Sequence, residues 1–220
     1  WNDFFPFGKK DNPYPLAKEG ILSYVKVDKV VLWIKILVAC IPAAVVGVLF
    51  DEQLEAIFYN YQTVSIALIV FGIAFILIEN RNAHQRSRIH SLRNITIQTA
   101  LLIGVFQLIA AIFPGTSRSG ATIVGALLLG VSRTVAAEFT FFLAIPVMFG
   151  ASLLKIVKFG FAFTMHEAII LVVGMIVAFV VSVFVIKFLM DYIKKHDFKV
   201  FGWYRIVLGI VVLLYFIFLG

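Results

Sequence analysis

Long apolar stretches constrain the fold of this chain more than any other feature of its sequence. An α-helix rises 1.5 Å per residue, so about 20 apolar residues cross the hydrocarbon core of a bilayer. The segment WIKILVACIPAAVVGVLF at residues 33–50 has about this length and carries a single charge. Four further stretches of similar character follow, at residues 61–78, 135–154, 168–187 and 203–219. They predict an all-α, polytopic membrane bundle that forms one domain over residues 1–220, preceded by a polar loop at residues 1–32.

Composition and charge support a membrane protein and argue against a nucleic-acid-binding one. The chain is 62% hydrophobic and 14% charged, whereas soluble domains are about 45–50% apolar and about 25% charged. Its net charge of +7 comes from basic residues in short gaps between apolar stretches, as in cytoplasmic loops. No basic face interleaved with aromatic residues is long enough to follow a nucleic acid backbone. The single cysteine, Cys40, excludes an intrachain disulfide and a cysteine-based metal cluster.

Two shorter apolar runs, at about residues 100–113 and 121–130, flank the segment PGTSRSG. Both are shorter than a bilayer crossing and have the length of re-entrant segments. If residues 95–130 enter and leave on one side, 14 loop Lys and Arg residues share that side and two lie opposite, whereas a full crossing divides them 11 to five. Because basic loops favour one side of a membrane, the sequence predicts a re-entrant helix pair with Arg118 at its tip, near the bilayer midplane.

The polar tip of this pair predicts a phosphate-binding site. A charge at membrane depth costs about 2.5–3.5 kcal/mol and is rarely kept without a partner. The planar guanidinium of Arg118 suits phosphate oxygens, and the hydroxyls of Ser117 and Ser119 add donors or a nucleophile. The run that follows begins a helix whose free N–H groups and positive dipole end face the tip. The other residues expected to contact substrate are Gly115, Thr116, Gly120, Thr122 and Gln107.

Plainer alternatives exist for several of these residues. Pro-Gly is a common turn, and an ordinary surface loop would need no ligand, but irregular backbone at membrane depth survives only where it is buried or lines a cavity. Glu138 and Gln107 could orient Arg118 or help to hold a cation, or could make ordinary helix–helix hydrogen bonds. The four histidines lie at loops or span ends without metal-ligand spacing, which indicates solvated side chains.

Residues 114–146, PGTSRSGATIVGALLLGVSRTVAAEFTFFLAIP, resemble the second signature region of the undecaprenyl-pyrophosphate phosphatases, the bacitracin-resistance membrane enzymes. The pattern Pro-Gly-x-Ser-Arg-Ser-x-x-Thr matches through Thr122, and the order of spans is similar over the whole chain. The resemblance implies a multi-pass hydrolase of the bacterial plasma (inner) membrane. It would release inorganic phosphate from undecaprenyl pyrophosphate and so recycle the lipid carrier for peptidoglycan synthesis. Arg118 would bind the pyrophosphate, with Ser117, Ser119 and Thr122 as hydroxyl contacts.

The resemblance also implies features that the residues do not identify. The family fold has two inverted halves, each with a re-entrant pair, and an N-terminal signature of paired glutamates and a Ser-Ser-Thr-Gly-His stretch linked to divalent cations, Mg²⁺ or Ca²⁺. These 220 residues contain no such stretch, so we expect the first re-entrant pair to be missing and this chain by itself to be catalytically impaired. Glu138 is the only nearby carboxylate that could serve as a metal ligand. The expected partners are the polyprenyl pyrophosphate and the membrane, and a homodimer stays open.

A transporter is the main rival interpretation. Broken helices with polar tips at the midplane also bind anionic substrates in secondary transporters, so a polyprenyl-phosphate carrier or flippase could use the same Arg118 site without hydrolysis. A non-catalytic membrane scaffold is a third interpretation. Release of phosphate, as opposed to movement of the intact lipid, distinguishes the enzyme from the transporter.

Overall fold

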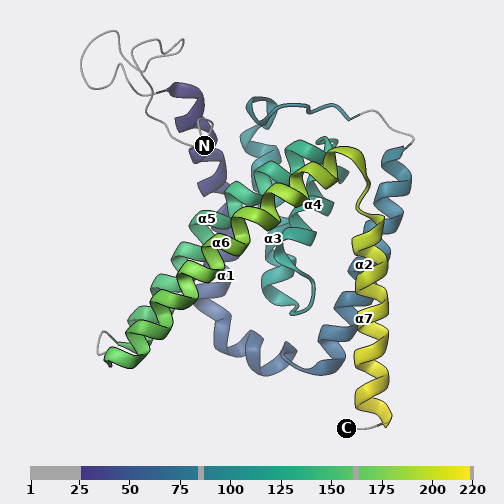
Figure 1. Cartoon of the computed structure of the whole chain (residues 1–220). Helices are drawn as coiled ribbons and strands as arrows, with labels where there is room; N and C mark the ends of the chain where they lie inside the picture. Colours follow the sequence, from purple (N-terminus) through teal and green to yellow (C-terminus); the bar gives the residue numbers. More distant parts are fainter. Residues whose placement is uncertain (1–25, 84–86, 161–163, 219–220) are drawn as a thin grey trace, which may run out of the picture.

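The computed structural model describes residues 26–83, 87–160 and 164–218 of the chain, and these residues are almost entirely helical (Figure 1). The α-helices are, in chain order, α1 (Val27–Phe58), α2 (Tyr61–Ala83), α3 (Ile97–Ile112), α4 (Arg118–Leu128), α5 (Arg133–Phe159), α6 (Met165–Lys195) and α7 (Lys199–Phe218). A short 3₁₀ helix, η2 (Leu92–Asn94), lies between α2 and α3.

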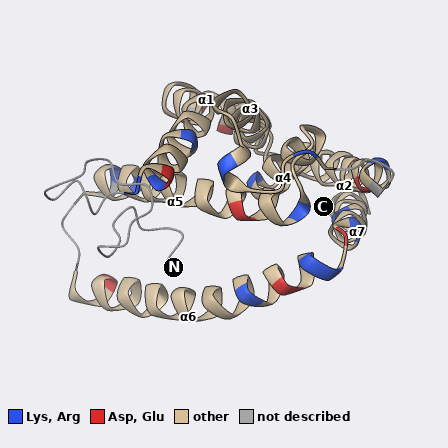
Figure 2. Cartoon of the chain, turned by 90° about the horizontal axis from the view of Figure 1, so that it is seen from above, with Lys and Arg blue, Asp and Glu red and all other residues tan. Residues whose placement is uncertain are grey.

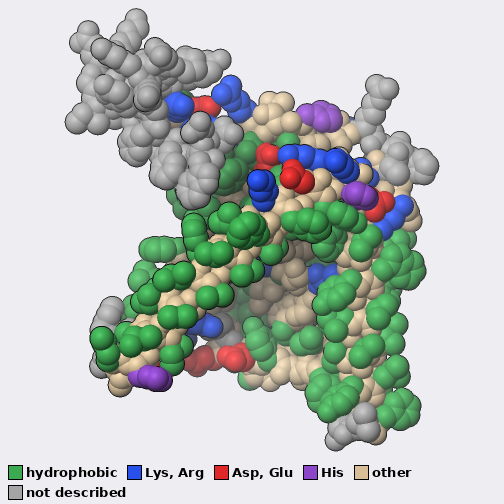
Figure 3. All heavy atoms as spheres, in the orientation of Figure 1, with side chains coloured by type: hydrophobic (Ala, Val, Ile, Leu, Met, Phe, Trp, Pro, Cys, Tyr) green, Lys and Arg blue, Asp and Glu red, His purple; other side chains and the backbone are tan. Residues whose placement is uncertain are grey.

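Five of these helices, α1, α2, α5, α6 and α7, are long and apolar enough to cross a membrane. Most of their apolar surface faces outward, as the space-filling view shows (Figure 3). Helix α6 is the extreme case. No residue in its most apolar 18-residue stretch is buried inside the molecule, and Phe184 and Phe188 are 70% and 71% exposed. A helix that is apolar all round needs an apolar environment on most sides, so the prediction of a polytopic helical membrane protein is confirmed.

Small residues bring the helices together in two pairs, α1 with α3 and α2 with α7. A Cβ atom on Gly104 of α3 would lie 2.3 Å from the Ala39 carbonyl oxygen of α1, and one on Gly72 of α2 would lie 2.7 Å from the Gly202 carbonyl oxygen of α7. Small residues allow such close approach, which is how membrane helices associate where apolar burial adds little. The two pairs hold α4 between them (Figure 1).

Helices α3 and α4 form a hairpin whose two ends lie at the same end of the molecule. The residues before α3 meet the residues after α4: the N–H groups of Arg88 and Ile89 donate to the Gly130 carbonyl, and the Ser132 N–H donates to the Ile89 carbonyl. Both helices are shorter than a bilayer crossing, at 16 and 11 residues. This geometry is the one expected of a re-entrant pair, and its depth in a bilayer stays a prediction.

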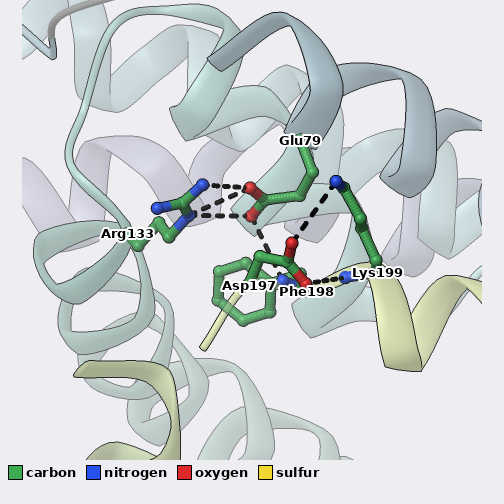
Figure 4. A network of polar contacts seen from close by, with 5 residues as sticks. All are labelled: Glu79, Arg133, Asp197, Phe198 and Lys199. Atoms are coloured by element: carbon green, nitrogen blue, oxygen red, sulfur yellow. Dashed lines mark hydrogen bonds and ion pairs between the residues drawn. The ribbon is translucent and has the colours of Figure 1, made fainter. Parts of the chain in front are cut away.

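A buried ion pair fastens the end of the molecule at which the hairpin begins and finishes (Figure 4). Figure 2 shows where the Lys, Arg, Asp and Glu positions lie along the helices. The fully buried carboxylate of Glu79 on α2 accepts from Arg133 Nε at 2.9 Å and from its Nη2 at 2.6 Å, at the start of α5. The Phe198 N–H, between α6 and α7, donates to the same carboxylate at 3.3 Å. Three segments that are distant in sequence therefore meet at one side chain.

The predicted loop at residues 1–32 needs a correction. Residues 1–25 lie outside the described residues, but residues 27–32 already belong to α1. Apolar residues continue back to Val27, and Asp28 lies in the first turn, where a negative charge favours the helix dipole. The helix therefore starts earlier than the apolar stretch alone indicates.

Candidate functional site

The turn between α3 and α4 has a backbone that few residues can adopt. Gly115 has φ +88°, and a Cβ atom there would lie 2.5 Å from the Val64 carbonyl oxygen of α2. Ser117 has φ +63°, the only positive φ at a non-glycine residue within the described ranges. Such a conformation costs about 1–3 kcal/mol and is often found at functional sites. The strained turn thus coincides with the segment that the sequence singles out.

Hydroxyl groups hold the first turn of α4 in place. Ser117 Oγ accepts from the Gly120 N–H and lies 3.3 Å from Ser119 Oγ. The Thr122 hydroxyl lies 3.0 Å from the Ser119 carbonyl oxygen, and Thr140 of α5 donates to Thr122 Oγ1 at 3.0 Å. The first N–H groups of a helix lack intrahelical acceptors and carry the positive end of its dipole. This turn is therefore a fixed, electropositive helix start.

The turn faces a cavity of 510 Å³ between α2, α4, α5, α6 and α7. The molecule is visibly hollowed between α6 and α7 (Figure 3). The polar part of the wall consists of Gly115, Ser117, Ser119, Gly120, Thr140 and Arg205. The apolar part consists of Leu68, Phe75, Ile123, Phe141, Leu189, Ile193, Phe198, Phe201 and Tyr204. A mostly apolar cavity with a few convergent polar groups is the usual form of a ligand site.

Arg205 on α7 is the wall residue that sequence reasoning missed. Its side chain is 7% exposed, and its Nη2 donates to the carbonyl oxygens of both Gly115 and Thr116. It therefore binds the turn from a helix 90 residues away in the sequence. A signal was present, because Arg205 is an ionisable residue inside an apolar span, which by itself indicates a functional residue.

Arg118 is the first residue of α4. It is half-buried and does not contribute to the cavity wall, and its guanidinium lies near Cys40 of α1. The structure thus brings Ser117, Ser119, Gly115 and Gly120 to one cavity and turns Arg118 toward α1.

Three other predicted residues occupy different surroundings. Thr116 and Gln107 are buried, at 0% and 1% exposure, and neither side chain has a hydrogen-bond partner. Glu138 lines a second cavity with Lys35, His90 and Arg93, at the charged end of the molecule. Glu138 is not among the residues that line the cavity at the serine hydroxyls, and the expectation that it orients Arg118 or helps to hold a cation stays a prediction. On α5, Thr140 lines the first cavity and Glu138 lines the second, because residues two positions apart on a helix do not face the same way.

The fold and this site define a class of protein: a multi-pass helical membrane protein with a cationic, hydroxyl-lined recess inside an apolar bundle. A profile of the family described as "Bacitracin resistance protein BacA" matches residues 14–211. The chain belongs to this family, which confirms the resemblance found in the sequence.

Curated relatives carry a consistent name. The chain is 65% identical to "Undecaprenyl-diphosphatase" of Desulfitobacterium hafniense over 210 residues, which cover 96% of this chain and 74% of the relative. It is 68% identical to "Undecaprenyl-diphosphatase 1" of Clostridium acetobutylicum over 194 residues, which cover 88% and 71%. It is 58% identical to "Undecaprenyl-diphosphatase" of Enterococcus faecalis over 214 residues, which cover 97% and 74%.

Proposed function

We propose that this protein hydrolyses undecaprenyl diphosphate to undecaprenyl phosphate and inorganic phosphate in the bacterial plasma membrane. The observation that carries this proposal is the high identity to proteins of that name over nearly the whole chain. The product would return to the lipid-carrier pool for cell-wall synthesis. The transporter interpretation receives no support from these relatives.

The candidate site offers what phosphoryl transfer asks of a protein. In this reaction an oxygen nucleophile attacks the terminal phosphorus, the bond from that phosphorus to the bridging oxygen breaks, and undecaprenyl phosphate leaves with the electron pair. The protein contributes mainly by positioning the groups and neutralising charge on the phosphate oxygens. We assign these roles to the α4 N-terminus, the hydroxyls of Ser117 and Ser119, and Arg118. The aromatic and aliphatic wall of the cavity suits the start of a prenyl chain.

The described residues do not identify the base or a resident cation. A serine nucleophile needs an activating base, and the cavity wall in the described ranges has no histidine and no carboxylate. Mg²⁺ and Ca²⁺ prefer carboxylate and carbonyl oxygens, and no group of three or more His, Cys, Asp or Glu side chains that could hold a metal ion occurs among the described residues. This donor set does not fit a bound divalent cation, so we derive no step through one.

The hairpin geometry supports a further proposal about orientation. We propose that α3 and α4 form a re-entrant pair that enters the membrane from the side on which most loop Lys and Arg residues lie. The tip of the pair reaches the middle of the bilayer. Single-cysteine substitutions at the tip and in the loop before α3, in a Cys40→Ser background, test this with impermeant thiol reagents. Labelling of the loop from the extracytoplasmic side would contradict it.

The function is tested by phosphate release from undecaprenyl or farnesyl diphosphate in detergent, with Mg²⁺ or Ca²⁺ present. The chain is assayed alone and preceded by the family's N-terminal signature segment, each with and without Arg118→Ala. Arg93→Gln is the matched control, because Arg93 is an exposed arginine paired with Asp28. We expect hydrolysis by the extended protein, loss of it in Arg118→Ala, and no change in Arg93→Gln. Binding of the lipid without release of phosphate by the extended protein would refute the enzyme and favour a carrier.

A further inference from the structure

Lys35 of α1 is a buried cation inside a helix that is apolar enough to span the membrane. Its side chain is 7% exposed, and its Nζ donates to the Arg93 carbonyl at 3.0 Å. Among the residues that the structure describes, no carboxylate forms an ion pair with it. An ammonium carries three donors, so two of them have no protein acceptor. A charge within a membrane span is rarely kept without a partner and by default indicates a functional residue.

Lys35 lines the second cavity, which has a volume of 690 Å³ and lies at the end of the molecule where the hairpin begins and finishes. Charged side chains gather at this end (Figure 3). Helix α1, the segment that contains η2 and the start of α5 form the wall, to which Ser91, Ser132 and Thr134 contribute hydroxyl groups. No residue of this wall belongs to the cavity at the serine turn. The second cavity is therefore a separate candidate site.

The start of α5 adds further donors to this wall. Ser132 is the N-cap residue of this helix of 27 residues, but its side chain makes no capping hydrogen bond. Its N–H donates to the Ile89 carbonyl at 2.9 Å, which fixes the segment before η2 against the helix start. The first N–H groups of a helix lack intrahelical acceptors and carry the positive end of its dipole. Because Ser132 and Thr134 line the cavity, this positive end lies at its wall, where it favours an anion.

Two carboxylates also line the cavity, but they do not cancel its positive charge. Asp28 is paired with Arg93 at 2.8 Å, and the Arg93 side chain is 61% exposed. Glu138 forms no ion pair with Lys35 within the described ranges. Lys29 lines the same wall. Lys35, Lys29 and the helix start together carry more positive charge than the one remaining carboxylate carries negative charge.

We propose that the second cavity binds a phosphate oxyanion. Lys35 Nζ and the N–H groups at the start of α5 are its donors, and the hydroxyls of Ser132 and Thr134 are further contacts. The oxyanion has two sources, the headgroup of an anionic phospholipid, which basic membrane surfaces attract, and inorganic phosphate in solution. This site goes beyond the proposed function and does not depend on it. A Lys35 that only holds the Arg93 carbonyl would bind neither ligand.

The test measures how a ligand slows the alkylation of a thiol on the cavity wall. The thiol is introduced by Ser91→Cys in a Cys40→Ser background, and the reagent is the uncharged N-ethylmaleimide. The chain is held in phosphatidylcholine nanodiscs, to which inorganic phosphate or phosphatidylglycerol is added. We expect protection by at least one of them. Lys35→Gln removes the charge and keeps a donor for the Arg93 carbonyl, so it should raise the amount of ligand needed for half-protection about 10- to 100-fold.

Two controls separate occupation of the cavity from a general effect of charge. Lys155→Gln removes an exposed lysine near the opposite end of α5 and should leave protection unchanged. A thiol introduced by Asn94→Cys in the same background lies at an exposed position that does not line the cavity. Its alkylation should not respond to either ligand.

The outcomes distinguish the two sources and can overturn the proposal. Protection by inorganic phosphate in phosphatidylcholine supports a soluble anion, and protection by phosphatidylglycerol alone supports a lipid headgroup. If neither protects the chain that retains Lys35, the proposal fails. It also fails if Lys35→Gln leaves protection unchanged. If Lys35→Gln does not fold, Lys35→Met decides by the same measurement, because an apolar side chain of similar volume often replaces a buried charge without loss of stability.

Discussion

Glu79 and Arg133 form a buried ion pair, and substitution of one or the other should lower the free energy of unfolding by very different amounts. Glu79 is fully buried, whereas the Arg133 side chain is 38% exposed. In Arg133→Gln the carboxylate stays buried, with the Phe198 N–H at 3.3 Å as its remaining donor. Breaking a buried pair so that a charge is left behind costs about 3–5 kcal/mol. In Glu79→Gln the arginine can still reach water, so we expect a cost of only about 1–2 kcal/mol.

The assay is reversible unfolding in mixed micelles, with the free energy of unfolding measured for both single variants and for the double variant. The double variant leaves no buried charge, so its cost should be smaller than the sum of the two single costs by about 1–3 kcal/mol. Lys194→Gln serves as the control, because Lys194 and Asp191 form an exposed pair. Equal costs for the two single variants, or a strictly additive double variant, would refute the argument from burial.

Three further predictions concern backbone and hydroxyl positions. Gly115→Ala should destabilise by more than about 1 kcal/mol and abolish phosphate release by the extended protein, because φ is +88° and a Cβ would lie 2.5 Å from a carbonyl oxygen of α2; wild-type activity would contradict this. Thr140→Val should cost about 1 kcal/mol in unfolding measurements, because it removes the donor to Thr122 and preserves shape; a neutral result would show that this hydrogen bond is not formed. Gly72→Ala should lower the melting temperature and Gly174→Ala should not, because a Cβ would lie 2.7 Å from a carbonyl oxygen of α7 in the first case and has nothing within 4 Å in the second. A harmless Gly72→Ala would count against the close α2–α7 contact.

The sequence by itself determined the class of fold and the family, and it singled out the segment proposed as the site. Membrane helices can be predicted from short stretches of sequence, because each apolar stretch must span the bilayer independently of the rest of the chain. The turn at Gly115 and Ser117 can also be predicted from the residues around it, because turn conformation depends on adjacent residues. The broken pair at residues 95–130 was indicated by the same local lengths and by the charges of the loops.

Only the tertiary structure decided which side chains share the cavity. Arg205 reaches the Gly115 carbonyl across 90 positions of sequence, and Glu138 is carried to a different cavity from the serines. The direction in which a helix presents a side chain depends on its rotation and on its partner, and here that is set by close contacts of small residues such as Gly72 with Gly202. Such contacts join residues that carry no local signal of one another, so the sequence indicated the candidate segment but not which side chains share its cavity.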